Sequence, residues 1–399
     1  MSAAPLQGLL VVDLSRYLPG PYATRLLRDL GARVIKVEEP SAGDPVRDAP
    51  PKIDGQSSLA ELLLPGVESV ALDLKREGGR EALLTLLARA DVLVESFRPG
   101  TLARFGLAPV ELRARFPRLV ICSISGYGQS GPLAPRSGHD LTYQAVSGLL
   151  APTARMPALP AADLAGAWSA ALSILAALRA RGESGDGVWI DAPLYDAALH
   201  SNVMAWSAEA GEDRDLHVPG YTLPLTGGWH FYHLYRTADG GYVAFAPLEP
   251  KHWRRFCDDA GKRDWRARQF EKGPAMRREL EALFASRSRD EWSEVFTRLD
   301  FPGEPVLSVA EALAHPQALE RGVVREGEDG FIRADYPALF DGERPRIADG
   351  SAVPALGEQT ETVLAEHGWT SGGSRRAARR AGVGAHGGFW RRLWAALRL

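Results

Sequence analysis

Three short segments of this 399-residue sequence carry side chains that could move a proton, and the first contains a histidine. Gly138 and His139 precede a run whose apolar residues recur with helical spacing. This pattern predicts that His139 lies at, or just before, the N-terminus of a helix. The positive end of a helix dipole favours the neutral imidazole, which is the form that a general base requires. On composition alone we favour the simpler interpretation, in which His139 only caps the helix.

The second segment, 161–166, places an aspartate at the start of a long apolar stretch. We expect Asp163 at the N-cap of a long helix, where its carboxylate would accept backbone hydrogen bonds. The free N–H groups of a helix N-terminus can also hold a developing oxyanion. A carboxylate beside such an oxyanion site is what the removal of a proton next to a carbonyl needs. Capping alone explains the same residue, so the segment by itself decides nothing.

The third segment, Leu248-Glu249-Pro250, follows a predicted hairpin. The residue before a proline avoids the helical region, so Glu249 is expected in an extended or turn segment. Taken alone it is an ordinary surface glutamate. The sequence motifs of several common enzyme classes are absent. Gly20-Pro21 after the first strand is not the glycine-rich fingerprint of a dinucleotide-binding protein, and no Walker A motif of a nucleotide triphosphatase occurs. The Gly-x-Ser-x-Gly motif of serine hydrolases and the Cys/His spacing of zinc sites are also missing.

The elements that must position His139 and Asp163 come from the first 200 residues, where short apolar runs alternate with amphipathic stretches. Strands are predicted at 9–12, 34–37, 69–72, 92–94, 119–124 and 188–191, and helices at 22–30, 79–89 and 164–180. Strands separated by helices predict an α/β fold, with a mainly parallel, Rossmann-like sheet covered by helices on both faces.

The domain organisation is predicted from changes in composition along the chain. Residues 1–205 form a large domain, the polar stretch 206–228 a linker, and 229–328 a smaller α+β domain that begins with a hairpin at 234–245. Residues 329–370 return to pack on the large domain. The tail, 371–399, is expected to be disordered with a short amphipathic helix, or alternatively to contact a membrane surface or a partner.

Composition places the chain among globular proteins, with 45% hydrophobic and 24% charged residues. Two cysteines, Cys122 and Cys257, read as reduced thiols of a cytoplasmic protein. The apolar run 164–178 is shorter than the ~20 residues of a membrane span, and the N-terminus lacks a signal-peptide pattern. The net charge of −3 argues against a nucleic-acid partner. This net charge is the sum of −10 for residues 1–370 and +7 for the tail, which holds seven arginines and no acidic residue.

Together these segments resemble the class III CoA-transferase (CaiB/BaiF) family over about residues 5–367. The resemblance is carried by ordered motifs: 6–16, 19–24, 30–38, 43–45, 72–75, 91–100, 235–240, 305–307, 311–312, 315–316 and 354–358. The sequence is more similar to the α-methylacyl-CoA racemase branch than to the transferase branch. That branch has Gly-His-Asp-x-x-Tyr, an Ala-Asp pair and a Glu-Pro pair, which match His139, Asp163 and Glu249 here.

The resemblance implies an acyl-CoA racemase that inverts the α-carbon of a 2-methyl-branched acyl-CoA by two-base 1,1-proton transfer. His139 and Asp163 would be the two bases, backbone N–H groups at the Asp163 helix end would hold the enolate oxygen, and Glu249 would orient His139. It further implies an interlocked homodimer, in which Glu249 comes from the partner chain. No metal and no cofactor beyond coenzyme A is implied. Coenzyme A contacts are implied at Tyr17, Leu18, Leu72, Lys75, Ser96, Phe97, Arg98 and Arg104.

Two other functions remain open at this stage. In a class III CoA-transferase, Asp163 would be a nucleophile that forms an acyl anhydride and moves coenzyme A between carboxylic acids. A third interpretation is a non-catalytic acyl-CoA-binding protein. The chain also departs from the racemase pattern: His139 and Asp163 are 24 positions apart (163 − 139), a short spacing, and Glu39-Pro40 replaces a basic coenzyme A contact. The proline-rich part of that spacing, 152–160, would border the acyl group, which leaves open a substrate different from that of a typical racemase.

Overall fold

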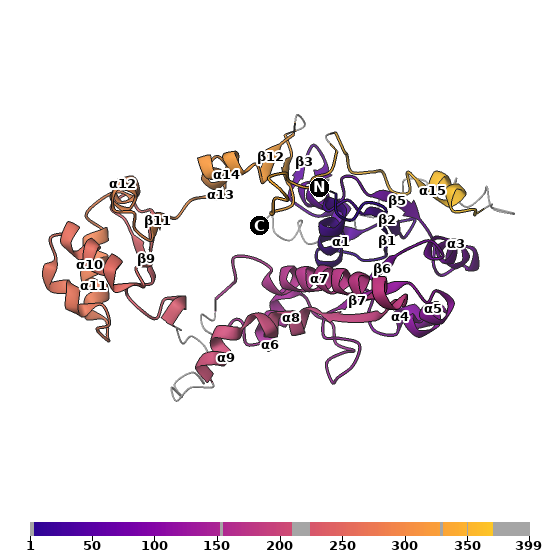
Figure 1. Cartoon of the computed structure of the whole chain (residues 1–399), viewed down its shortest axis with the longest axis horizontal. Coiled ribbons are helices and arrows are strands. Elements are labelled where there is room, and N and C mark those ends of the chain that lie inside the picture. Colours follow the sequence, from indigo (N-terminus) through magenta and orange to yellow (C-terminus); the bar gives the residue numbers. More distant parts are fainter. Residues whose placement is uncertain (1–3, 152–154, 210–223, 328–329, 349, 370–399) are drawn as a thin grey trace, which may run out of the picture. The chain divides into compact units, whose positions relative to one another are not determined.

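A computed structural model describes residues 4–151, 155–209, 224–327, 330–348 and 350–369 (Figure 1). The chain forms two compact units: residues 1–149, 157–201 and 317–399 belong to the large unit, and residues 150–156 and 202–316 to the small one. The sequence analysis placed the end of the small domain at residue 328, twelve residues later than this division (328 − 316). The tail predicted at 371–399 and most of the linker lie outside the described residues, although 206–209 end a helix, α9 (Val203–Glu209).

The large unit is built on a six-stranded parallel sheet with the order β5-β2-β1-β6-β7-β8. Its strands are β1 (Leu10–Asp13), β2 (Arg33–Glu38), β5 (Glu68–Ala71), β6 (Val92–Glu95), β7 (Val120–Ser125) and β8 (Trp189–Pro193). The four central strands, β2, β1, β6 and β7, bury residues on both of their faces, as parallel strands between helices do. The predicted α/β fold with a mainly parallel sheet is therefore confirmed.

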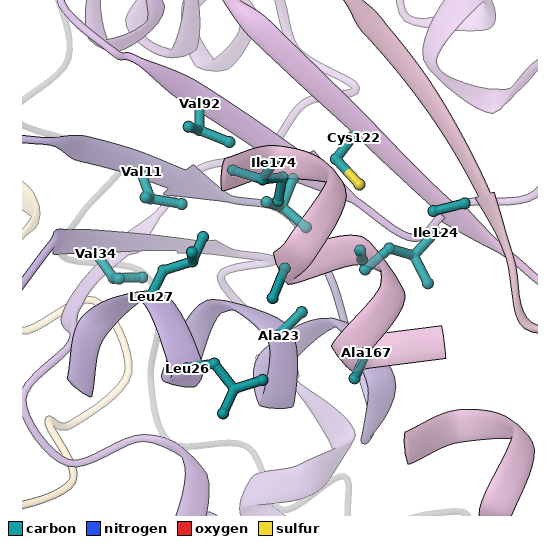
Figure 2. Packing of buried hydrophobic residues seen from close by; sticks show 14 of the residues in the cluster. Val11, Ala23, Leu26, Leu27, Val34, Val92, Cys122, Ile124, Ala167 and Ile174 are labelled. Atoms are coloured by element: carbon teal, nitrogen blue, oxygen red, sulfur yellow. The ribbon is translucent and has the colours of Figure 1, made fainter. Parts of the chain in front are cut away.

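Helices cover both faces of this sheet, so alternate strand residues belong to two separate cores. On one face α1 (Pro19–Asp29) and α7 (Ala161–Ser184) pack against Val11, Val34 and Ile124 (Figure 2). On the other face Val12 and Ile35 pack against α3 (Glu77–Leu87), α5 (Pro109–Arg115) and α15 (Thr360–Glu366).

Helix α7 has 24 residues and extends three residues before and four after the predicted range. Its buried face consists mainly of small residues, including Gly166, Ala167 and Ala170, which let it lie close to α1 and α8 (Leu194–Ser201). A Cβ at Gly166 would overlap the Leu194 side chain, so this crossing requires glycine. Of the described helices, α7 alone has the length and hydropathy of a membrane span, and about a third of that span is buried.

The end of the chain covers the edge of the sheet at β5. The Ser69 N–H donates to Gln359 Oε1 at 2.8 Å, and the Ala71 N–H donates to Thr360 Oγ1 at 2.9 Å. These bonds satisfy backbone groups that an open edge would leave unpaired. The segment around α15 therefore packs on the large unit, and α14 (Pro316–Arg321), β12 (Val324–Glu326) and β13 (Ile332–Ala334) precede it in the chain.

The remaining elements of the large unit are short. They are η1 (Pro45–Asp48), β3 (Lys52–Ile53), β4 (Gln56–Ser57), α2 (Ser58–Leu63), α4 (Thr101–Arg104) and α6 (Asp140–Val146).

The small unit packs helices against a three-stranded antiparallel sheet with the order β11-β10-β9. The predicted hairpin is present as β9 (His233–Arg236) and β10 (Tyr242–Phe245), with Gly240 in a left-handed conformation in its turn. Other elements are η3 (Pro224–Thr226), α10 (Pro250–Asp259), η4 (Arg263–Arg268), α11 (Ala275–Phe284), α12 (Arg289–Leu299), β11 (Gly303–Pro305) and α13 (Val309–Leu313). Its core is aromatic, with Trp253, Phe284 and Trp292 fully buried.

Candidate active site

The large sheet offers a ligand site where its strand order reverses. The chain passes from β1 through α1 to β2 on one side, and from β5 through α3 to β6 on the other side of β1. Ligands of such sheets bind outside the carboxyl ends of the strands at this switch point. The loops after β1 and β6 are joined there, because the Arg16 N–H donates to Ser96 Oγ at 2.9 Å.

The structure brings the eight residues expected to contact coenzyme A to this carboxyl edge or directly beyond it. Tyr17 and Leu18 follow β1, Leu72 and Lys75 follow β5, Ser96, Phe97 and Arg98 follow β6, and Arg104 ends α4, which comes next. Lys75, Arg98 and Arg104 are exposed, and the Arg98 guanidinium donates to Ser137 Oγ at 2.6 Å. Exposed cations of this kind suit phosphate groups. Their contact with coenzyme A stays a prediction.

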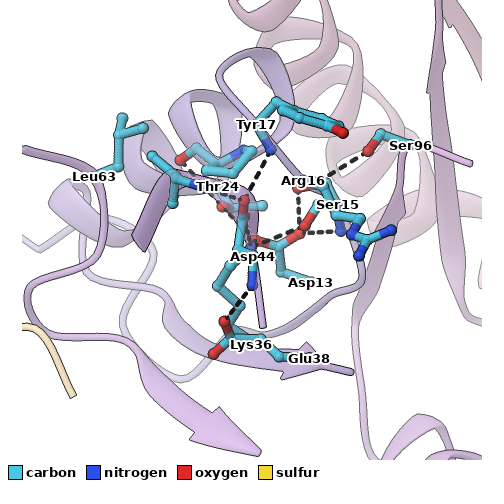
Figure 3. A network of polar contacts seen from close by, with 12 residues as sticks. Asp13, Ser15, Arg16, Tyr17, Thr24, Lys36, Glu38, Asp44, Leu63 and Ser96 are labelled. Carbon is cyan, nitrogen blue, oxygen red and sulfur yellow. Dashed lines mark hydrogen bonds and ion pairs between the residues drawn. The ribbon is translucent and has the colours of Figure 1, made fainter. Parts of the chain in front are cut away.

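A buried charge network holds the loop that follows β1 (Figure 3). Lys36 Nζ lies 2.9 Å from an oxygen of Asp44 and 3.4 Å from one of Asp13, and it donates to Ser15 O at 2.9 Å. Burial alone would lower the pKa of Lys36, but the two carboxylates outweigh it and raise that pKa. Asp44 also accepts the Tyr17 N–H at 3.0 Å. Tyr17 has a φ of 69°, a conformation unfavourable for its residue type, which this network stabilises.

His139 stands at the N-cap of α6, as the sequence predicts. The Thr142 hydroxyl secures this end of the helix: it accepts the His139 N–H at 3.1 Å and donates to His139 O at 2.8 Å. The imidazole is exposed. His139 is reached from the carboxyl end of β7, because residues 126–138 connect that end of the strand to α6.

Asp163 does not occupy the predicted N-cap. The N-cap of α7 is Pro160, and Asp163 is the third residue of the helix. The sequence interpretation failed because the apolar run starts at Leu164, whereas the helix gains two alanines and the aspartate ahead of it. At this position Asp163 belongs to the first turn of the helix and is half-buried.

The first turn of α7 is capped by a different carboxylate, that of Asp140 on α6. Asp140 Oδ1 accepts the N–H groups of Ala162 at 2.9 Å and Asp163 at 3.1 Å, and Oδ2 accepts Gln144 Nε2 at 2.6 Å. The expectation that these backbone groups are free to hold an enolate oxygen is therefore corrected. The same bonds join the N-termini of α6 and α7, so His139 and Asp163 come from adjoining helix ends.

Two causes raise the pKa of Asp163 to about 7. The larger is burial, which disfavours the charged carboxylate, and the smaller is repulsion by the charge of Asp140. A carboxyl group that titrates near neutral pH can both give and take a proton under physiological conditions. Such perturbed groups concentrate at functional sites.

Tyr143 is buried on α6 and lies close enough to Asp163 to be affected by its charge. Its ring meets that of Tyr127 edge-on, with centroids 5.0 Å apart. A Cβ at Gly126 would lie 2.5 Å from the Tyr143 hydroxyl oxygen, so Gly126 leaves the room that this ring needs. Burial, followed by the charge of Asp163, raises the pKa of Tyr143 to about 12, so the phenol stays neutral.

Glu249 belongs to the small unit, where it is the N-cap of α10 and is exposed. Pro250 follows it at the first helical position, in agreement with the expected extended backbone at Glu249. The structure thus brings His139 and Asp163 together within one unit and places Glu249 in the other. Within the described parts of the chain, no group of three or more His, Cys, Asp or Glu side chains is arranged to hold a metal ion.

Comparison with known proteins identifies the family. Residues 6–360 match CoA-transferase family III. The chain belongs to this family of enzymes. It is 33% identical over 375 residues to a human α-methylacyl-CoA racemase, covering 92% of this chain and 94% of the relative. It is also 33% identical over 386 residues to an acetyl-CoA:oxalate CoA-transferase of Acetobacter aceti, covering 91% and 95%.

The architecture of this family III chain is also similar to solved structures. A CaiB/BaiF family protein from Brucella suis has a TM-score of 0.79 and 29% sequence identity, with 92% of this chain and 100% of that chain covered. The family and the fold inferred from sequence motifs are therefore confirmed. Because racemases and CoA-transferases are both among the relatives, family membership leaves the reaction undecided.

Sequence reasoning missed two residues of this family III site, Asp140 and Tyr143. Both lie in the motif that drew attention to His139. The sequence pattern that could have drawn attention to Asp140 is an acidic residue in the first turn of a predicted helix, where the helix dipole stabilises a carboxylate. Its bonds to α7, 22 and 23 positions further along the chain, are tertiary contacts that no local pattern reveals.

Proposed function

We propose that the protein is an acyl-CoA racemase that inverts the α-carbon of a 2-methyl-branched acyl-CoA thioester. The observation that supports the proposal is the joining of two helix ends through Asp140: His139 is the N-cap of α6, and Asp163, whose pKa is raised to about 7, is in the first turn of α7. A racemase needs two groups, one on each face of the α-carbon, that exchange protons near neutral pH.

In the proposed reaction the thioester carbonyl acidifies the α-hydrogen. His139, as neutral imidazole, removes that hydrogen from one epimer while the protonated Asp163 delivers its proton to the opposite face. In the reverse direction Asp163 is the base and the imidazolium is the acid. The proton count of the pair is the same before and after each turnover, but one proton has moved from Asp163 to His139. Exchange of protons with solvent must return the pair to its starting state before the same epimer can react again.

Coenzyme A would lie along the carboxyl edge of the sheet, with its phosphates near Lys75, Arg98 and Arg104. These side chains are exposed and follow β5 and β6 beyond the carboxyl edge of one sheet, which supports this placement. We further propose an interlocked homodimer in which Glu249 of the partner subunit orients His139. A carboxylate hydrogen-bonded to an imidazole fixes its tautomer and raises its basicity.

A CoA-transferase is the second candidate, because transferases match this chain as well as racemases do. In that reaction the ionised Asp163 attacks an acyl-CoA carbonyl, the thiolate of coenzyme A leaves, and an acyl aspartyl anhydride forms. A second carboxylic acid would then be required to accept coenzyme A. The pKa of about 7 leaves part of Asp163 protonated at neutral pH, which weakens a nucleophile but suits an acid–base catalyst.

The two reactions differ in whether a second acid is needed. One 2-methylacyl-CoA epimer is incubated with the enzyme in deuterated water without any added carboxylic acid. Incorporation of deuterium at the α-carbon, with formation of the other epimer, supports the racemase. Absence of exchange, with transfer of coenzyme A once a carboxylic acid is added, would establish the transferase instead. Inactivity in both assays with retained coenzyme A binding would indicate a binding protein.

A further inference from the structure

The contacts of Asp140 give this residue a place in the proton transfer that the motif alone does not assign. Its carboxylate accepts three hydrogen bonds: one from its own helix, through Gln144, and two from the first turn of α7. One of the α7 donors is the backbone N–H of Asp163 itself, 3.1 Å from Asp140 Oδ1. Asp140 is therefore bonded to the residue whose side chain would carry the proton.

These bonds fix the backbone of Asp163 relative to α6. The N-cap of α7 is a proline with no side-chain acceptor, so the helix end depends on a carboxylate from elsewhere. Asp140 supplies that carboxylate immediately after His139 in the chain. A shift of either helix would break the bonds to Ala162 and Asp163, and would separate the two proposed bases.

Asp140 also brings negative charge next to Asp163. Tyr143 from α6 lies beside both carboxyl groups, since the charges of Asp163 and Asp140 each raise its pKa, and Tyr127 and Arg98 in turn act on Tyr143. The Tyr143 phenol is neutral at physiological pH, and among the groups that act on Asp163 itself only Asp140 adds to the effect of burial. Two carboxylates that share a site do not readily ionise together.

We propose that Asp140 is a positioning residue of the proton transfer: it holds Asp163 against α6 and, through its charge, keeps a proton on the Asp163 carboxyl group. The inference rests on the proposed racemase function, in which Asp163 acts as an acid in one direction. Asp140 itself donates and accepts no proton in the reaction. Burial is the larger cause of the raised pKa of Asp163, so loss of the Asp140 charge removes part of that shift and not all of it.

Asp140→Asn separates the charge from the hydrogen bonds, because the amide oxygen can still accept the two N–H groups of α7. The protein is labelled with ¹³C at aspartate carboxyl carbons, and Asp163 is assigned as the signal that disappears in Asp163→Asn. In the wild type this signal should titrate at a pH of about 7. In Asp140→Asn its midpoint should fall by roughly one pH unit or more and stay above 3.8.

Asp48→Asn is the matched control, since it removes the same charge from an exposed ion pair with Lys52. It should leave the Asp163 midpoint unchanged. A midpoint in Asp140→Asn equal to that of the control would overturn the inference. If Asp140→Asn does not fold, Asp140→Ser takes its place, because a serine hydroxyl can also cap a helix without charge.

The pH profile of α-deuterium exchange provides a second readout. A fall of one unit in the pKa of Asp163 lowers its protonated fraction above pH 7 about tenfold. With the epimer whose α-hydrogen His139 removes, Asp140→Asn should therefore exchange about tenfold more slowly than the wild type at pH 8, with a smaller loss at pH 6. A uniform loss at every pH would show a merely structural role and contradict the electrostatic part of the inference.

The NMR titration does not depend on activity, so failure of the racemase proposal and failure of this inference are distinguishable. A wild type without exchange, together with a shifted midpoint in Asp140→Asn, would reject the reaction and retain the coupling of the two carboxylates. α-Deuterium exchange in the wild type, together with an unshifted Asp163 midpoint in Asp140→Asn, would retain the racemase reaction and reject the coupling of the two carboxylates.

Discussion

Replacement of Asp163 by asparagine is expected to stabilise the protein while it removes proton transfer. Burial and the neighbouring Asp140 raise the pKa of Asp163 from 3.8 to about 7. The folded protein thus holds this proton more tightly than the unfolded chain does. At a pH where the carboxyl group is ionised, its burial opposes folding. Asparagine has nearly the same shape and cannot ionise, so the variant escapes this cost.

The size and pH range of the effect follow from the two pKa values. Below pH 3.8 the group is protonated in both states, and its favourable contribution to folding is complete. As the pH rises from 3.8 to about 7, unfolding releases a proton and that contribution is lost at about 1.4 kcal/mol per pH unit. The full shift corresponds to roughly 4 kcal/mol, and we expect a gain of ~2–4 kcal/mol for the variant at pH 8.

Urea and thermal unfolding of the wild type and Asp163→Asn at several pH values from 4 to 8 measure this difference. The variant should match the wild type to within ~1 kcal/mol at pH 4, and exceed its melting temperature by about 5–10 °C at pH 8. Asp48→Asn, which removes an exposed charge, should show no such trend. A stability difference that stays constant across this range, or a destabilised variant at pH 8, would refute the assignment of a raised pKa to Asp163.

The other predictions concern the second base, the partner chain, the loop network and coenzyme A. His139→Ala should slow α-deuterium exchange by ~10²–10⁴-fold, without preventing coenzyme A transfer if that reaction occurs. Co-expression of His139→Ala and Glu249→Ala chains with different tags should give mixed dimers that regain exchange if Glu249 acts across the dimer; inactive mixed dimers would place it within one chain. Lys36→Met leaves two buried aspartates without their cation, so the free energy of unfolding measured in urea should fall by ~3–5 kcal/mol; an unchanged value would show that the network contributes little. Arg98→Ala should raise the KM for acyl-CoA about tenfold and change kcat by less than about threefold, and the opposite pattern would remove Arg98 from coenzyme A binding.

The strands of the large sheet could be predicted because each is a short apolar run buried on both faces. The run at 119–124, for example, becomes β7 with all six of its residues from Val120 to Ser125 buried. The position of His139 could be predicted for a similar reason, since a glycine and a polar residue before a periodic run mark a helix start. These signals are local, so one sequence suffices to recognise them.

The organisation around Asp163 could not be predicted, because it depends on a contact between two helix ends. Local preferences assign an aspartate before an apolar run to the N-cap, but here Pro160 takes that position and Asp140 supplies the acceptor. The raised pKa of Asp163 likewise comes from burial and from a residue 23 positions away. Tertiary packing therefore converts an apparent capping residue into a candidate acid–base catalyst.

The two-base mechanism itself is tested most directly by the position of deuterium at early turnover. A single 2-methylacyl-CoA epimer is incubated with the wild type in deuterated water, and both epimers are analysed by mass before a tenth of the substrate has reacted. Proton transfer between His139 and Asp163 predicts that the inverted epimer carries one deuterium, while the remaining starting epimer carries much less. Equal deuterium in both epimers, or an inverted epimer that keeps its hydrogen, would contradict the mechanism.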